Sequence, residues 1–468
     1  MPGYEDLRRK HRADARAMLP SMLDRVDWPA ERTAAHRLAA LTQLLAVAER
    51  GSPWHRNRLA GLQPAGLQLA GPGRELEEAD ILALLPVMTK DDLMDNFDEI
   101  VTDPRLGLDV VEAHLETLTT DAYLFDRYHA CASGGSSGRR GVFVYDWDEW
   151  TTTYWSAFRH EARARLREPR LAAAPARPAM VAAQTATHMS SSHAQTFSNP
   201  EDWSRFPVTL PLGAIVAGLN SLRPTLLVGY PSVLHGLAGE ARRGRLRIQP
   251  LQILCVAEPL LPEIREALEG TWGVPVGNAW GLSEAGMAGA SCGFGPWLHL
   301  SDDLCIIEPI DLRGRPVPVG ERSERILLTN LFNHTLPLIR YEVTDQITLM
   351  AGACRCGSGH QRIEDPQGRL DDSFSYGDLV VHAHVFRSAL GRRRQVVEYQ
   401  VRQTAAGAAV AIHCLEPLEP QELAGLRVEL AEALAKLGLR HPQVEIDSVD
   451  HLPRQHAGKL KRFVALPK

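Results

Sequence analysis

Apolar and polar positions follow two different periods along this chain. Over residues 4–50, apolar side chains recur three and four positions apart, which predicts amphipathic helices. Further along, short apolar runs alternate with helical patterns. The strand-like runs are PAMVAAQ (178–184), PTLLVGY (224–230) and LQILCVA (251–257), and the helical segments are PSVLHGLAGEARRG (231–244) and PLLPEIREALEGTWG (259–273). Because strands alternate with helices, we expect parallel α/β layers.

The pattern changes within residues 303–350. The short apolar runs DLCIIEPI, ERILLTNL and DQITLM alternate with turn residues, which predicts an antiparallel β unit. The segment EDPQGRLDD (364–372), rich in Pro, Gly and Asp, then interrupts the pattern. Beyond it we expect strands at 396–403, 407–415 and 442–449 and a helix over 420–438.

These elements predict an α/β protein of two domains. The large N-terminal domain, residues 1–367, would hold the parallel layers and the antiparallel unit. A hinge near residues 366–371 would connect it to a small α+β C-terminal domain, residues 368–468.

Composition narrows the class of protein. The net charge of −6 gives no electrostatic reason to expect a nucleic-acid partner. No apolar run approaches the ~20 residues that a membrane span needs, and the charged N-terminus lacks the apolar stretch of a signal peptide. We therefore expect a cytoplasmic protein without a membrane partner.

Cysteine spacing points to a metal more than to disulfides. Four of the seven cysteines lie within residues 292–356, and Cys354 and Cys356 form a C-x-C pair. Cys292, His299 and His360 are nearby in the sequence, and sets of four thiolates and imidazoles are the ligands that structural zinc prefers. The alternative is that these are ordinary reduced cysteines of a cytosolic protein.

The stretch ASGGSSGRRG (132–141) could hold an anion. Successive backbone N–H groups in a Gly/Ser turn form a concave anion site, and hydroxyls and arginines add donors. The stretch is neither a Walker loop nor a G-x-G-x-x-G opening a helix. A phosphate-binding loop and a structural Gly-rich turn both remain open on these residues alone.

Three further stretches carry candidate side chains. NAWGLSEAG (278–286) offers an aromatic ring and Glu284, LPLIRYEVTDQI (336–347) places Asp345 after a strand, and GRLDD (368–372) lies at the expected hinge. Each signal is weak alone, because carboxylates after strands are usually solvated. Lysine is rare in this chain, so Lys459 in HAGKLKRFVALPK is a further candidate for a functional side chain, and the alternative is that this segment is a solvated basic tail.

In their order, these motifs resemble those of the adenylate-forming enzymes, most closely the phenylacetate–coenzyme A ligase branch. The matching motifs are LLPVMTKDDL (84–93), the Gly–Ser stretch, AEP (257–259), NAWGLSE (278–284), IRYEVTD (339–345) and LPRQHAGKLKR (452–462). Two departures stand out: Arg139–Arg140 replace the branch's Lys–Pro, and Glu342-Val343-Thr344 differ from its pattern before Asp345.

The resemblance implies an ATP site and assigns its residues. The Gly–Ser loop would hold the β- and γ-phosphates, and the AEP segment would border the adenine with Trp280 stacking on it. Glu284 would bind Mg²⁺, Asp345 would accept hydrogen bonds from the ribose hydroxyls, Arg369 would approach phosphate or ribose, Asp371 would be the hinge and Lys459 the catalytic lysine. The implied ATP-binding residues are Ser133, Gly135, Ser136, Ser137, Gly138, Arg139, Ala257, Glu258, Pro259, Asn278, Trp280, Gly281, Ser283, Asp345 and Arg369.

The implied reaction joins a carboxylate to the α-phosphorus of ATP and expels pyrophosphate. Since two anions must meet, catalysis is mainly positional and electrostatic. Mg²⁺ on Glu284 would neutralise oxygen charge, and the compact ammonium of Lys459 would bridge the attacking carboxylate and ATP. The acyl-adenylate would then pass to a thiol, with coenzyme A as the branch default.

The resemblance also implies a structural zinc ion and an acid pocket. Zinc would be held by Cys292, His299, Cys354 and Cys356, with His360 as a competing fourth ligand. The pocket would be lined by Tyr145, His188, Tyr230 and Pro231. The run MSSSHAQTF (189–197) is either a polar pocket wall, which favours a small aromatic acid over a long fatty acid, or a surface loop.

Several alternatives remain open for the partners. The acceptor could be the phosphopantetheine of an acyl carrier protein or an amine in a biosynthetic pathway, and a nucleotide-binding protein without ligase activity is a further hypothesis. Intact Glu284 and Lys459 argue against the last one. A homodimer is compatible with the sequence, which does not decide the oligomeric state.

Overall fold

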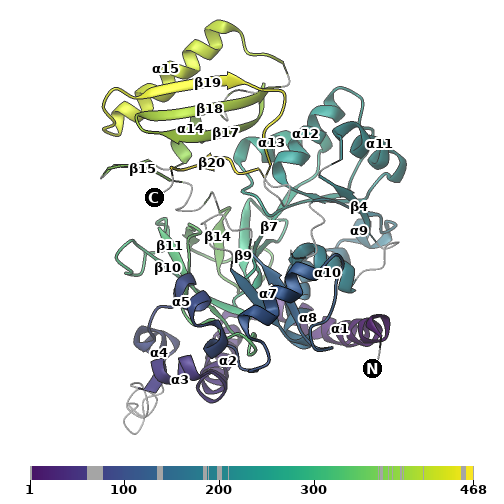
Figure 1. The fold of residues 1–468 in the computed structure, drawn as a ribbon. Helices are drawn as coiled ribbons and strands as arrows, with labels where there is room; N and C mark the ends of the chain where they lie inside the picture. Colours follow the sequence, from purple (N-terminus) through teal and green to yellow (C-terminus); the bar gives the residue numbers. More distant parts are fainter. Residues whose placement is uncertain are drawn as a thin grey trace.

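The fold is known from a computed structural model (Figure 1). It describes residues 3–60, 77–133, 141–182, 187, 189–197, 203–208, 210–366, 368, 373–377, 379–381, 383–390, 393, 395–414, 416–454 and 460–466. None of the helices in these ranges is long and apolar enough to cross a membrane.

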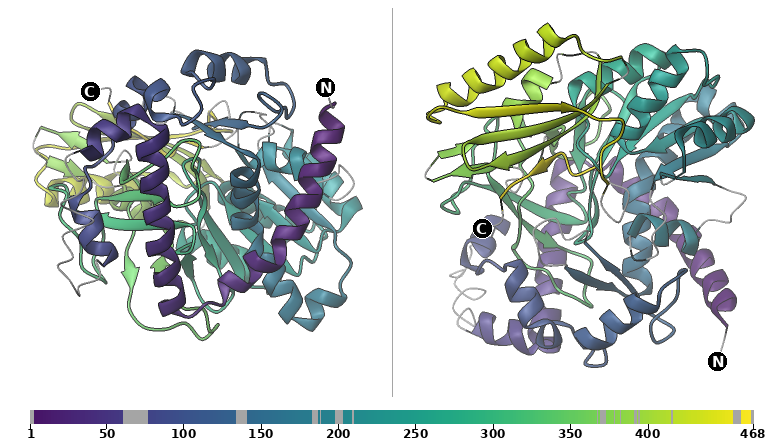
Figure 2. Two further views of the ribbon diagram at one scale, coloured as in Figure 1. Left: turned by 90° about the horizontal axis from the view of Figure 1, so that it is seen from below. Right: turned by 45° about the horizontal axis from the view of Figure 1, so that its top comes forward.

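The chain begins with two long helices, as the apolar spacing predicts. They are α1 (Tyr4–Val26) and α2 (Ala30–Gly51), and we call them with their connecting turn the N-terminal hairpin. Both lie across one face of the molecule in the left view of Figure 2. Shorter helices follow: α3 (Pro53–Leu59), α4 (Glu78–Leu84), α5 (Lys90–Asp95), α6 (Phe97–Ile100) and α7 (Leu108–Thr117).

Nine strands in the described part of the chain form one mixed sheet, in the order β13-β14-β9-β8-β7-β6-β5-β3-β4. From β4 to β7 the strands of this order pair in parallel. From β7 to β13 they pair antiparallel. The strands are β3 (Pro178–Ala182), β4 (Ser204–Pro207), β5 (Leu226–Gly229), β6 (Gln252–Val256), β7 (Val276–Leu282), β8 (Gly286–Ser291), β9 (Trp297–Leu300), β13 (Leu349–Met350) and β14 (Arg362–Glu364).

The predicted parallel α/β layers are confirmed. The three strand-like runs form β3, β5 and β6, which pair in parallel register. Helices connect them because a parallel crossover needs a long connection. The helices of this region are α8 (Trp147–Arg167), α9 (Pro169–Ala173), α10 (Met189–Phe197), α11 (Leu212–Leu222), α12 (Pro231–Arg242) and α13 (Pro262–Trp272).

The predicted antiparallel unit is correct in two of its three runs. DLCIIEPI and ERILLTNL give β10 (Cys305–Ile310) and β11 (Arg325–Asn330), which pair with each other and with β12 (Tyr341–Val343). The prediction is wrong for DQITLM, because its strand β13 pairs with β14 at the edge of the nine-stranded sheet instead. A separate antiparallel pair, β1 (His129–Ala132) and β2 (Val142–Tyr145), flanks the Gly–Ser stretch.

The C-terminal strands enclose a core of their own, centred on Phe374, Phe386 and Phe463. Its β18, α15 and β19 form the predicted β–α–β unit, and α12 of the N-terminal region lies beside its β17 (Figure 1). The elements are β15 (Phe374–Tyr376), β16 (Leu379–Val381), α14 (His384–Leu390), β17 (Val396–Thr404), β18 (Gly407–Cys414), α15 (Pro420–Lys436), β19 (Gln443–Ser448) and β20 (Phe463–Val464).

One buried ion pair joins α8 to the turn that connects β9 with β10. The Arg159 guanidinium makes two hydrogen bonds of 2.7 Å to the two carboxylate oxygens of Asp303, and both side chains are fully buried. Burial alone would raise the pKa of Asp303, but Arg159 overrides it and holds that pKa well below its ordinary value. Arg25 also lies 4.0 Å from Asp303, but the Arg159 pair has the shorter bonds, and its loss would leave a buried carboxylate with weaker compensation.

Replacement of Arg159 by Met should therefore destabilise the fold by about 3–5 kcal/mol, measured by urea unfolding at pH 7. The pKa of Asp303 is lowered on folding, so its stabilisation is present above the unfolded pKa of about 4 and is lost as the pH falls through the lower folded value. The difference between wild type and variant should thus shrink as the pH falls from about 5 towards 2.

The exposed pair of Arg315 and Asp311 offers a matched control, because its Arg also binds an Asp carboxylate, with Nη2 2.7 Å from the nearer oxygen. Arg315→Met should change the free energy of unfolding by less than about 1 kcal/mol. Equal losses for the two Arg variants would show that burial does not set the strength of the Arg159 pair.

Candidate functional site

The ring of Trp280 and the carboxylate of Asp345 meet at the centre of the molecule. Trp280 lies on β7 of the nine-stranded sheet, and Asp345 follows β12 of the three-stranded sheet. Trp280 Nε1 donates a hydrogen bond of 2.9 Å to Asp345 Oδ1, and both residues are buried. The fold thus brings together two residues that the sequence assigns to the adenine and the ribose.

Glu284 lies in the tight turn between β7 and β8, four residues after Trp280. Gly286 in this turn has φ +72°, and a Cβ there would lie 3.0 Å from Thr153 Cα of helix α8. Tyr145 Oη donates to the carbonyl of Ser283 at 2.6 Å, and Asn330 Nδ2 donates to the carbonyl of Glu284 at 2.8 Å. We call residues 282–286 the Glu284 turn; buried side chains hold its backbone from two sides.

Tyr145 is fully buried, below the Glu284 turn. Burial, then the nearby Cys131 and Glu284, raise the pKa of Tyr145 well above its ordinary value. Its hydroxyl therefore stays protonated and donates to Ser283. The family resemblance assigns Tyr145 to the acid pocket, which stays a prediction; in the structure its hydroxyl holds the backbone of the Glu284 turn.

The AEP segment follows β6, where Ala257 has the left-handed φ of +67°. Glu258 accepts hydrogen bonds from the backbone N–H of Ser232 (3.2 Å) and from that of Leu460 (3.1 Å). Ser232 belongs to the first turn of α12, and Leu460 belongs to the C-terminal region. The Glu258 carboxylate thus joins the two parts of the chain at the predicted adenine site.

Arg454 makes a second contact between the two parts of the chain. Its guanidinium pairs with Glu398 on β17 and reaches Ser232 Oγ at 3.5 Å. Arg454 belongs to the LPRQHAGKLKR motif that carries the family resemblance.

The ends of the Gly–Ser stretch are joined by two hydrogen bonds between Ser133 and Gly141. Ser133 N donates to Gly141 O at 2.9 Å, and Gly141 N donates to Ser133 Oγ at 2.8 Å. The stretch is therefore the connection of the β1–β2 hairpin. Other predicted residues lie outside the described part of the chain: Gly135, Ser136, Ser137, Gly138, Arg139, His188, Arg369, Asp371 and Lys459.

The remaining nucleotide and pocket predictions fall on described residues. Asn278 is buried and donates through Nδ2 to Asp365 at 2.9 Å, so its amide is engaged within the protein. Gly281 is exposed beside the Glu284 turn, and Pro259 is half-buried after Glu258. Tyr230 and Pro231 are buried at the start of α12.

The run MSSSHAQTF forms helix α10, so its interpretation as a surface loop is wrong. Ser192, His193 and Thr196 are buried. The hydroxyls of Ser192 and Thr196 each donate to Asp121 at 2.7 Å, so these two groups are used inside the protein. They therefore do not support the argument that a hydroxyl-rich wall faces the acid, and the pocket itself stays a prediction.

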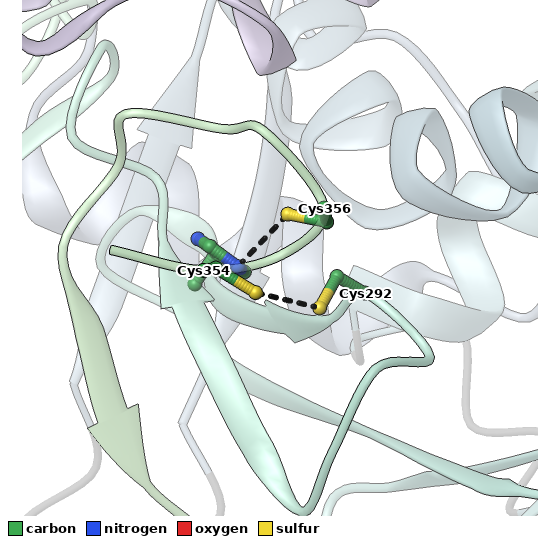
Figure 3. A group of neighbouring side chains, drawn as sticks. Cys292, Cys354 and Cys356 are labelled. Atoms are coloured by element: carbon green, nitrogen blue, oxygen red, sulfur yellow. Dashed lines mark hydrogen bonds between the residues drawn. The ribbon is translucent and has the colours of Figure 1, made fainter. Parts of the chain in front are cut away.

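Four predicted metal ligands converge beside the antiparallel part of the large sheet, and Figure 3 shows three of them, Cys292, Cys354 and Cys356. The ligand atoms of Cys292, His299, Cys354 and Cys356 all lie within 4.8 Å of one another. The sulfurs of Cys292 and Cys354 are 3.7 Å apart, and Cys356 Sγ is 3.4 Å from His299 Nε2. Tetrahedral zinc with its usual bond lengths would place two sulfurs about 3.8 Å apart and a sulfur and a nitrogen about 3.6 Å apart.

The chemistry of the cluster also fits a cation. A hydrogen bond between the Cys292 and Cys356 thiols raises the pKa of Cys292 and lowers that of Cys356, so the cluster holds one thiolate even before a cation binds. His299 Nδ1 lies 3.2 Å from the carbonyl of His360, which orients the ring. The competing ligand His360 is outside the cluster: its Nδ1 and Nε2 lie against the carbonyls of Leu300 and Arg25.

The loop that carries Cys354 and Cys356, residues 354–360, also holds the N-terminal hairpin, and we call it the metal-ligand loop. Ser358 Oγ donates to Val26 O at 2.7 Å, and Gly359 N donates to Trp28 O at 3.1 Å. Arg163 of α8 pairs with Asp27 and donates to the carbonyl of Cys356 at 3.1 Å. The turn of the hairpin is thus bound directly to the metal-ligand loop.

Sequence reasoning missed the buried polar residues that hold the site in place. These residues are Asn330, Asn333 and Glu149. Asn330 binds the backbone of the Glu284 turn, and Asn333 and Glu149 bind backbone groups more than a hundred positions away. Their local sequence gives little signal, because Asn and Glu are usual in loops and first helical turns. Only the unusual density of asparagines in TNLFNHT could have drawn attention.

Comparisons with known proteins agree with the family resemblance. No family model matches the chain. The curated phenylacetate–coenzyme A ligase of Pseudomonas putida is 28% identical over 165 residues, which span 33% of this chain and 36% of that relative. The match thus covers about a third of the relative's length.

Solved structures match over much more of the chain. A 2-hydroxyisobutyryl-CoA ligase in the postadenylation state has a TM-score of 0.70, with 19% identity over 95% of this chain and 91% of that one. The same enzyme in the thioesterification state has a TM-score of 0.56, with 20% identity over 94% of this chain and 91% of that one. An anthranilate CoA ligase with anthranoyl-AMP reaches 0.50, with 15% identity over 72% of this chain and 66% of that one.

Gly359 provides a test of the contact between the hairpin and the metal-ligand loop. A Cβ at this position would lie 2.5 Å from Ala30 N and 2.8 Å from Trp28 O, both of which are backbone atoms. Gly359→Ala should therefore push the hairpin away, at a cost of about 1–3 kcal/mol. Trypsin should then cleave the arginine-rich helix α1 faster than in the wild type, as followed by mass spectrometry.

Gly270→Ala in helix α13 is the control, because a Cβ there meets no atom within 4 Å. It should leave the cleavage of α1 unchanged. The same cleavage rate in both variants would contradict a tight contact at Gly359.

Proposed function

We propose that this chain, which has the fold of the adenylate-forming ligases, activates a carboxylic acid with ATP and transfers the acyl group to a thiol. The observation that carries the proposal is the hydrogen bond between Trp280 and Asp345 within this fold, together with the bond from Tyr145 of β2 to Ser283, which ties the turn of Glu284 to the hairpin of the Gly–Ser loop. An aromatic face, a metal-binding carboxylate and a ribose-binding carboxylate are the groups that the family's ATP site requires.

In the first step, the substrate carboxylate attacks the α-phosphorus of ATP and pyrophosphate leaves. Trp280 and the AEP segment would orient the adenine, Asp345 would bind the ribose, and Glu284 would hold the Mg²⁺ that neutralises phosphate oxygens. Ser133 and the rest of the Gly–Ser loop, with Arg139 in place of the usual lysine, would bind the β- and γ-phosphates. Lys459 would bridge the two anions.

In the second step, a thiolate attacks the acyl carbon and AMP leaves. We propose coenzyme A as the acceptor, which the similar 2-hydroxyisobutyryl-CoA ligase also binds. The C-terminal domain, residues 368–468, would turn about the hinge at Asp371 between the two steps. The hydrogen bond from Leu460 N to Glu258 supports Lys459 as the catalytic lysine of this domain. Leu460 follows Lys459 directly in the sequence and lies at the AEP segment.

We propose a small aromatic acid as the substrate. Tyr230 and Pro231 at the start of α12, with Tyr145 and His188, would form its pocket. Of the similar ligases, one was solved with anthranoyl-AMP, an aromatic acyl-adenylate, and another acts on the small 2-hydroxyisobutyryl group, so this fold accepts small acids of both kinds.

We also propose a structural zinc ion on Cys292, His299, Cys354 and Cys356. Four protein ligands fill a tetrahedral zinc, so the ion would leave no position for water and would act only in folding. The distances within the cluster support this assignment. The ion would keep the metal-ligand loop in the shape that holds the hairpin.

Pyrophosphate release tests the proposed activity. The protein with ATP, Mg²⁺ and a small aromatic acid should release pyrophosphate, and added coenzyme A should give the thioester. Lys459→Ala should lower the rate of the first step by a factor of about 10² or more, because a positioned charge is lost. Lys436→Ala, at the exposed end of α15, is the matched control and should retain the rate.

The panel of acids and acceptors decides between the alternatives. If an acyl-adenylate forms but reacts only with a carrier protein or an amine, that partner is the acceptor in place of coenzyme A. Failure of every acid to give pyrophosphate would favour a nucleotide-binding protein without ligase activity.

Metal analysis tests the zinc proposal. Freshly purified protein should contain one zinc ion per chain, and Cys356→Ser should reduce this content to a minor fraction. Cys414→Ser, which replaces a cysteine of the C-terminal domain far from the cluster in sequence, should retain the ion. Wild-type protein without stoichiometric zinc would exclude the site.

A further inference from the structure

Two buried asparagines lie where β11 ends: Asn330 is the last residue of the strand, and Asn333 lies in the segment that follows it. Asn330 Oδ1 accepts hydrogen bonds from the backbone N–H groups of Phe332 (3.1 Å) and Asn333 (3.0 Å). Asn333 Oδ1 accepts one from Leu336 N at 2.8 Å. Each amide oxygen therefore shapes the segment itself, and each amide nitrogen is directed to another element.

The two amide nitrogens reach the two walls of the proposed ATP site. Asn330 Nδ2 donates to the carbonyl of Glu284 at 2.8 Å, and Asn333 Nδ2 donates to the carbonyl of Val144 at 3.0 Å. Val144 lies on β2, the strand that continues the Gly–Ser stretch. The segment from Asn330 to Asn333, which we call the asparagine bridge, thus connects the Glu284 turn to the hairpin of the Gly–Ser stretch.

Other buried groups fix the bridge in turn. Glu149 of helix α8 accepts hydrogen bonds from His334 N (2.7 Å) and Thr335 N (2.9 Å) through one carboxylate oxygen. Asn330 and Asn333 are fully buried. In such a setting an unpaired amide or carbonyl is costly, so the groups have one stable arrangement.

We propose that Asn330 is a positioning residue for Mg²⁺: it holds the backbone of Glu284 so that the carboxylate lies at a fixed place relative to the phosphate-binding hairpin. This inference rests on the proposed function, in which Glu284 binds Mg²⁺. The physical reason is that Mg²⁺ requires nearly ideal octahedral geometry with short bonds, so a small shift of one ligand weakens its binding. Groups that orient a metal ligand commonly change metal affinity 10- to 100-fold when removed.

The variant Asn330→Asp isolates this one contact. Aspartate keeps the oxygen that accepts from Phe332 and Asn333, but it has no N–H to donate to Glu284. We expect the Mg²⁺ concentration for half-maximal pyrophosphate release to rise about tenfold or more, while the acid concentration for half-maximal rate stays the same. Asn330→Ser, which is neutral and too short to reach Glu284, should shift the Mg²⁺ dependence in the same direction and separates the lost hydrogen bond from the added charge.

Asn220, a half-buried residue, provides a control with the same pattern of hydrogen bonds. Its Nδ2 donates to Arg245 O at 2.9 Å and its Oδ1 accepts from Arg247 N at 2.6 Å, so it makes the same kinds of bonds on helix α11. Asn220→Asp should leave the Mg²⁺ dependence unchanged. If Asn330→Asp and Asn330→Ser also retain the wild-type Mg²⁺ dependence, or if the acid dependence shifts as much as that of Mg²⁺, Asn330 has a purely structural role and the proposal is overturned.

A failure of the proposed function can be told apart from a failure of this inference. If no acid gives pyrophosphate with the wild type, calorimetric binding of ATP at increasing Mg²⁺ replaces the rate assay. Weaker Mg²⁺-dependent binding in Asn330→Asp than in Asn220→Asp then supports the bridge, and equal binding overturns it. A wild type that binds no ATP in the presence of Mg²⁺ overturns both proposals.

Discussion

The buried ion pair between Arg159 and Asp303 is the constraint on which the N-terminal region depends. It connects α8 to the turn between β9, a strand of the large sheet, and β10, a strand of the small one. Separating two desolvated charges is costly, so the pair keeps the helix against the turn that joins the two sheets. Other elements are then placed by their contacts to the same helix.

Helix α8 uses its remaining polar side chains for those contacts. Glu149 binds the segment after β11, Ser156 accepts from Met287 N on β8, and Arg163 reaches the hairpin and the metal-ligand loop. These are hydrogen bonds to backbone groups or ion pairs between segments far apart in the sequence. The Glu284 turn therefore lies on a frame of buried polar bonds as well as on apolar packing.

The sequence predicts the elements of this fold better than their connections. Apolar periodicity locates the parallel strands and the C-terminal β–α–β unit, because burial on one or two faces determines which side chains are apolar. It cannot distinguish the sheet that a short edge strand joins, so DQITLM was placed in the wrong one. The motif residues Trp280 and Asp345 were identified from the family resemblance, whereas Asn330 and Asn333 act through partners that only the folded chain brings close. Long-range polar pairs of this kind do not produce a periodic pattern in the sequence.

The close packing at Gly359 has a consequence for how relatives of this chain can vary. A side chain at this position would occupy the space of the hairpin's own backbone, so no neighbouring rotamer can relieve the contact. Natural sequences that keep this arrangement should carry glycine five residues after the first cysteine of the C-x-C pair. A homologue with another residue there must either lack the hairpin or place it elsewhere. A single position could therefore sort homologous genomic sequences by the architecture of their N-termini before any of their structures is known.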